Sequence, residues 1–92
     1  MIKEEISEQL TFYINKIEEI QQQLADEFEK VGVTNKSDLN EVFAILNEQA
    51  VKLNSMKGMS KEFFRNNEQH IQKVLTQTQK IVQTSEKVVE NL

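Results

Sequence analysis

The sequence predicts an all-α protein: an elongated three-helix antiparallel bundle with coiled-coil-like packing, formed as a single domain over residues 1–92. The chain has 92 residues, no proline and only two glycines, so it offers little of the turn chemistry that β-hairpins need. Its apolar residues recur at alternating steps of three and four, the period of one buried helix face. Without a break at Gly58, the same pattern would give a long two-helix hairpin, which is the alternative architecture.

The first helix is expected over about residues 2–31. Gly32 follows directly, and glycine readily adopts the left-handed conformation that ends many helices. Residues 1–31 carry eight acidic side chains against three lysines, a net charge of −5. The apolar stripe that would bury one side of this helix consists of Ile6, Leu10, Tyr13, Ile17, Ile20, Leu24, Phe28 and Val31.

The second helix is expected over about residues 38–57, after a loop at residues 33–37. Ser37 or Thr34 can cap it, because a hydroxyl accepts a hydrogen bond from a free backbone N–H of the first turn. Apolar residues lie on both sides of its seam, as in a helix that touches two neighbours. They are Leu39, Val42, Phe43, Leu46, Ala50, Leu53 and Met56, with Ile45 beside the row.

The third helix is expected over about residues 61–91, with Gly58 ending its predecessor and Ser60 capping its start. Its apolar stripe repeats every seven residues, and Thr78 and Ser85 occupy the centre of that seam. Small residues there can let two helices approach closely while each hydroxyl bonds back to its own helix. The alternative is a weak seam that exchanges partners or orders only on binding.

The helix lengths predict two uncovered apolar rows. At 1.5 Å per residue the helices span roughly 45, 30 and 45–48 Å, so the short middle helix leaves about 15 Å of each neighbour without cover. Uncovered apolar rows usually mark interaction surfaces. The predicted partner-binding residues in these rows are Ile2, Ile6 and Leu10 at one end, and Val82, Ser85, Val88, Val89 and Leu92 at the other.

Phe12 completes the predicted partner-binding set. It lies on the side of the first helix opposite Leu10, beside Tyr13. Either it covers the end of the bundle or stands exposed by chance, or it anchors a partner, since large exposed aromatic side chains favour interface cores.

Several classes of function lack the residues that they need. His70 is the only histidine and cysteine is absent, so no metal-ligand set is expected. No side chain is placed to activate a serine or tyrosine, and no glycine-rich loop could hold a phosphate, so we expect no enzyme, cofactor or small-molecule substrate. The net charge of −4 disfavours nucleic-acid binding.

The N-terminal residues lack the apolar core of a secretory signal, and no apolar run reaches transmembrane length. We therefore expect no membrane insertion and cytoplasmic synthesis without a signal peptide. Export that needs no cleaved leader remains compatible with this sequence.

In size, acidity and helical pattern the whole chain resembles the small Trp-x-Gly proteins and related helical partners of type VII secretion systems. Phe64 and Glu68 match the aromatic-to-acid spacing of that family's tail signal, but the chain has no tryptophan and so lacks the Trp-x-Gly turn. The resemblance implies a helical protein that dimerises and travels with, or targets, a larger toxin. The outline is equally similar to small helical chaperones of type III and flagellar export.

These observations together predict a non-enzymatic helical protein–protein interaction module. Its expected partner is another helical protein, a second copy of the chain, or both. An adaptor, chaperone or co-secreted partner of a secreted or effector protein is the preferred form. The alternative is a self-assembling structural or regulatory coiled-coil protein.

Overall fold

The computed structural model describes residues 3–31 and 37–91, and this part of the chain forms four α-helices and no strand. Helix α1 spans Lys3–Val31, α2 spans Ser37–Lys57, α3 spans Lys61–Asn66 and α4 spans Glu68–Glu90. The predicted all-α class is confirmed. The expected stop at Gly32 and cap at Thr34 lie outside the described residues.

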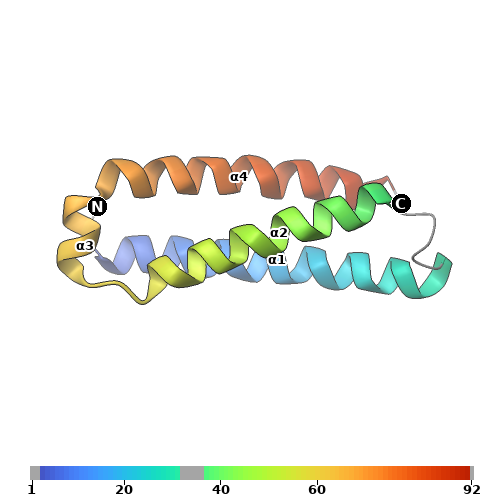
Figure 1. The fold of residues 1–92 in the computed structure, drawn as a ribbon, viewed down its shortest axis with the longest axis horizontal. Helices are drawn as coiled ribbons and strands as arrows, with labels where there is room; N and C mark the ends of the chain where they lie inside the picture. Colours follow the sequence, from blue (N-terminus) through green and yellow to red (C-terminus); the bar gives the residue numbers. More distant parts are fainter. Residues whose placement is uncertain (1–2, 32–36, 92) are drawn as a thin grey trace.

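The three long helices run up, down and up along one elongated body (Figure 1). Helix α2 is antiparallel to both α1 and α4, and α1 packs along both of these helices. The molecule measures 47 × 19 × 17 Å, which is close to the length of α1 alone at 1.5 Å per residue. The long helices therefore lie side by side over most of their length.

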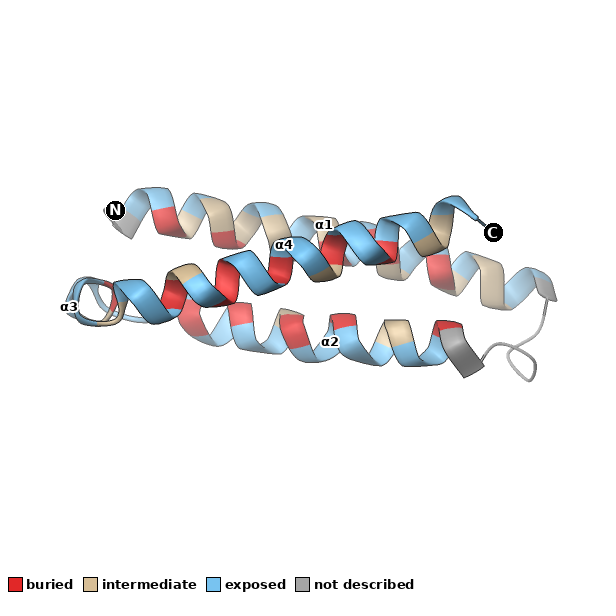
Figure 2. Ribbon diagram, turned by 90° about the horizontal axis from the view of Figure 1, so that it is seen from above, coloured by how far each residue is buried: buried red, intermediate tan, exposed pale blue. Residues whose placement is uncertain are grey.

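The core is a single apolar seam shared by the three long helices. Its buried residues follow the stripes read from the sequence, and Figure 2 shows them on the inner side of each helix. Each buried Ile or Leu contributes about 1.5–3 kcal/mol by leaving water. The fully buried aliphatic side chains are Ile6, Leu10, Ile17, Leu24, Leu46, Leu53 and Ile71.

Helices α2 and α3 are separated by a turn at residues 58–60. Helix α2 ends at Lys57, and Ser60 caps α3 by accepting a hydrogen bond at 3.2 Å from the Phe63 backbone N–H. A Cβ at Gly58 would meet no atom within 4 Å, and the backbone there is not left-handed. The predicted break at this point is confirmed, and the long two-helix hairpin does not form.

The third predicted helix, about residues 61–91, is interrupted in the structure, which corrects the sequence-based boundary. Asn67 leaves the helical conformation (φ −122°, ψ 22°) between α3 and α4. Both its backbone N–H and its side-chain amide donate to the Phe63 carbonyl oxygen, at 3.0 and 2.9 Å. Asparagine competes for backbone bonds in this way, so it favours a helix end over a helix interior.

The interruption changes how the helix lengths add up. Helix α3 turns across the end of the molecule where α1 begins, and its Phe64 is buried there (Figure 1). Helix α4 then starts at that end and has only 23 residues, about 35 Å. It therefore runs alongside α1 and does not overshoot it. The two uncovered apolar rows inferred from a continuous third helix are absent from the described residues.

Candidate functional site

A shallow apolar groove lies between α2 and α4, towards the C-terminal end of α4. Its volume is about 220 Å³. Helix α2 contributes Val42 and Ile45, and α4 contributes Lys80, Ile81, Thr84 and Ser85.

The groove presents apolar surface to solvent. Ile45 is 43% exposed, although a side chain of this kind gains free energy from burial. Val42 and Ile81 are half-buried in its walls, whereas Ser85 is buried. A hydrophobic concavity with a projecting isoleucine at its edge can bind the apolar face of a helix.

The local sequence explains why the groove is open here. Ile45 lies beside the main apolar row of α2, so it cannot turn fully into the core. Opposite it, α4 has the small side chains of Thr84 and Ser85, which fill less of the space between the two helices than leucines would. Wide apolar stripes on both helices and small residues at their seam together leave the concavity.

A buried polar pair fixes the register of α2 against α4 next to the groove. The Gln49 side-chain amide donates to the Thr78 hydroxyl oxygen at 2.6 Å, and the Thr78 hydroxyl donates to the Val74 carbonyl oxygen at 2.7 Å. Gln49 is 4% exposed and Thr78 is fully buried. Sliding α4 along α2 would leave a buried amide without its partner, at a cost of about 1–3 kcal/mol.

The hydrogen bonds of Thr78 bear on the two interpretations of the small seam residues Thr78 and Ser85, close packing or a weak seam. The Thr78 hydroxyl does bond back to its own helix, as the close-packing interpretation predicts. The same hydroxyl also accepts a bond from α2, which the sequence pattern did not indicate. Gln49 was missed because a glutamine beside Ala50 reads as polar helix surface, although it follows Leu46 by three residues and therefore shares its face.

Charged residues of opposite sign border the groove. Glu41 and Glu48 are exposed and lie four residues before and three residues after Ile45, so they share its side of α2. On α4, Lys80 lines the groove and Lys87 lies two helical turns further on. The groove thus has an acidic edge on α2 and a basic edge on α4.

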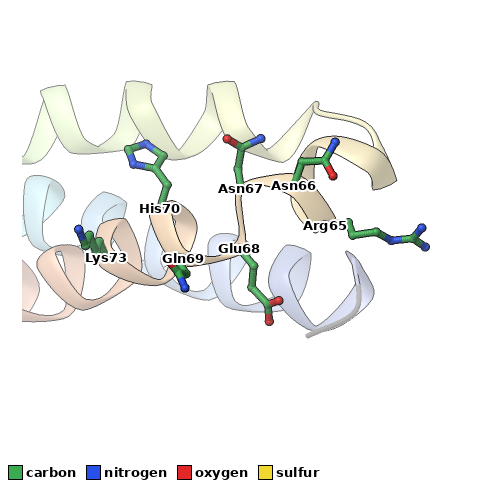
Figure 3. A pocket seen from close by; sticks show the side chains of 7 residues that line it. All are labelled: Arg65, Asn66, Asn67, Glu68, Gln69, His70 and Lys73. Atoms are coloured by element: carbon green, nitrogen blue, oxygen red, sulfur yellow. The ribbon is translucent and has the colours of Figure 1, made fainter.

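A second, polar depression of about 560 Å³ lies at the α3–α4 junction. Its side chains do not converge: Figure 3 shows Asn67 and His70 on one side of the chain, Glu68 on the other, and Arg65 directed away from them. Catalysis or ion binding needs groups that face a common point. This surface does not provide such a point.

The predicted partner-binding residues of the two apolar rows fall into three groups. Ile6, Leu10, Val82 and Ser85 are buried in this chain, so the expectation that they are uncovered is wrong. Val88 and Val89 are half-buried against the core, while Ile2 and Leu92 lie outside the described residues. Of the described members of the set, only Ser85 lines the groove.

Phe12 is 54% exposed on α1, away from the groove. Its ring meets Tyr13 edge-on at 5.3 Å between centroids, and the Lys16 ammonium lies 5.7 Å from its centroid. It therefore does not cover the end of the molecule. Two neighbours on its own helix shield part of the ring, and this reduces its value as an anchor.

Across the described ranges, no cluster of three or more His, Asp or Glu side chains is arranged to hold a metal ion. None of the described helices combines the length and the apolar character that crossing a bilayer requires. Comparison of the chain with known protein families, with curated proteins and with solved structures finds no match.

Proposed function

We propose that the chain is a non-enzymatic helical interaction module that binds a helical segment in the groove between α2 and α4. One observation carries the proposal: at a concave site the Ile45 side chain is exposed, and the side chains of Val42 and Ile81 are only half-buried. An amphipathic helix buries its apolar face in such a groove through residues spaced three and four apart. Coiled-coil-like contacts between helices would then extend from the core of the chain to its partner.

An adaptor, chaperone or co-secreted partner of a larger protein is the form we favour, supported by the likeness in size and helical pattern to secretion partners. Self-assembly is the second candidate. The opposite charges at the two edges of the groove favour it, since a surface that carries both signs can be complementary to itself.

Affinity capture from the cells that produce the chain tests the proposed function. The Ile45→Glu variant places a charge in the groove, whereas Val51→Glu is a matched control on the same helix, at a valine that is 61% exposed and does not line the groove. We expect a partner that the unchanged chain and Val51→Glu retain and that Ile45→Glu loses. Equal retention by all three proteins would contradict binding through the groove.

A further inference from the structure

We propose that the occupant of the groove is the same groove of a second copy, in a two-fold dimer whose symmetry axis runs parallel to the helices. This inference rests on the proposed function, because it names the helical surface that binds in the groove, and it develops the second candidate, self-assembly, for this site. Three features of the described residues support the dimer: the position of each charged residue along the helix axes, the sign of the charge at each edge of the groove, and the projecting side chain of Ile45.

The Gln49–Thr78 hydrogen bond shows which residues of α2 and α4 lie at the same height along the long axis of the molecule. The bond joins residue 49 of α2 to residue 78 of α4, residues 42 and 45 line the groove together with residues 81, 84 and 85, and the two helices are antiparallel. Each step forward on α2 therefore matches one step back on α4, with a rise of about 1.5 Å per residue. Glu48 then lies near the height of Lys80, and Glu41 lies near the height of Lys87.

A two-fold axis parallel to the helices keeps every height and exchanges the two sides of the groove. Helix α2 of one copy then lies on α4 of the other, so Glu48 faces Lys80 of the second copy and Glu41 faces its Lys87. The symmetry makes each pair twice. These four side chains form no ion pair with another described residue of their own chain, so the charges stand open to a second copy.

The other face-to-face arrangement is disfavoured. A two-fold axis across the helices would set α4 on α4 and α2 on α2, so that the lysine edge meets lysines and the glutamate edge meets glutamates. Like charges brought together at an interface cost free energy and direct association towards the complementary arrangement. The charge pattern therefore selects the parallel axis.

The apolar residues match in the same arrangement. By the same register, Ile45 lies at the height of Ile81 and Val82, and its side chain projects from α2. In the dimer it packs against Ile81 of the second copy. Each copy supplies one projecting isoleucine and receives one, which is the self-complementarity that a closed two-fold interface requires.

The match is confined to one end of the molecule. Beyond Glu48 the next charge on this side of α2 is Lys52, and the nearest charge on α4 is Lys73, so the signs no longer oppose. We therefore expect the contact to involve residues 41–48 and 80–88, and to be a reversible dimer and not an obligate one.

Sedimentation equilibrium of charge-exchanged proteins tests the arrangement. One variant carries Lys80→Glu with Lys87→Glu, and the other carries Glu41→Lys with Glu48→Lys. Each variant has edges of a single sign, so we expect the dimer dissociation constant to rise at least about ten-fold. An equimolar mixture of the two variants restores opposite signs at both edges and should form heterodimers with the affinity of the unchanged chain. The protein with all four changes should dimerise equally well, and Val51→Glu should behave as the unchanged chain.

Three results would overturn the proposed dimer: an unchanged chain that stays monomeric at every concentration, single-edge variants that still dimerise, or a mixture that stays monomeric. All four positions are exposed, so we expect the substitutions to leave the helices intact. Far-UV circular dichroism of each variant checks that loss of helix is not the cause of any loss of dimer. A monomeric chain that still captures a partner through Ile45 would refute this inference and leave the proposed function standing. A dimer that is indifferent to Ile45→Glu would refute the groove as the site of self-association.

Discussion

Replacement of Thr78 by valine removes the hydroxyl at the centre of the α2–α4 seam and keeps the volume of the side chain. The Gln49 amide, only 4% exposed, then loses the acceptor that it contacts at 2.6 Å. A buried donor without a partner costs about 1–3 kcal/mol. In a chain of this length each kcal/mol lowers the melting temperature by roughly 4–8 °C, so the shift is easily measured.

The partner substitution should behave differently. Gln49→Leu removes the donor, but the Thr78 hydroxyl keeps its own hydrogen bond to Val74 and is left with no unsatisfied hydrogen. We expect this change to cost less than about 1 kcal/mol. The double substitution removes both polar groups, and exchanging a buried polar pair for apolar groups of similar shape is often nearly neutral or stabilising.

Urea unfolding followed by circular dichroism at a fixed, low protein concentration measures all four proteins, and the low concentration keeps dimerisation from raising the apparent stability. The interaction energy follows from the cycle of single and double substitutions. Thr78→Val with unchanged stability, or a double variant less stable than Thr78→Val alone, would refute the assignment of this pair.

Three further predictions concern the corner between α2 and α4. Phe64→Ala should lower the free energy of unfolding by about 3–5 kcal/mol because Phe64 is 2% exposed, whereas Phe12→Ala on the exposed face of α1 should cost less than about 1 kcal/mol. Ser60→Ala removes the cap bond to the Phe63 N–H and should cost about 1 kcal/mol in the same urea assay; no change would show that α3 does not depend on that cap. Gly58→Ala should raise the free energy of unfolding by about 0.4–1 kcal/mol, since the added Cβ meets open space and restricts the unfolded chain; a loss of stability would mean that the turn needs a conformation reserved for glycine.

The helices could be predicted because the residues that determine each helix lie close together in the sequence. The buried residues of α1, from Ile6 to Leu24, follow the period of three and four that the sequence shows. Ser60 was recognisable as a cap because its role depends only on the residues that follow it. The break at Asn67 was missed, since asparagine within an apolar helical pattern can either point to solvent or bond to the backbone, and the sequence does not show which.

The candidate site was less accessible from the sequence, because it depends on how two helices meet. The uncovered rows were inferred by adding helix lengths, and the single break at Asn67 removed about 10 Å from the third helix and so covered Ile6 and Val82. Ile45 was visible as a residue beside the seam of α2. That it opens onto small residues of α4 requires the register, which the Gln49–Thr78 bond sets and no local pattern reveals.

Backbone amide NMR spectra recorded over a dilution series test self-association through the α2–α4 groove, because they report on every residue of the unchanged chain. The proposed dimer predicts that resonances of residues 41–48 and 80–88 move with concentration, while those around Phe12 on α1 stay fixed. Spectra that do not change with concentration, or changes centred on Phe12, would contradict self-association through the α2–α4 groove.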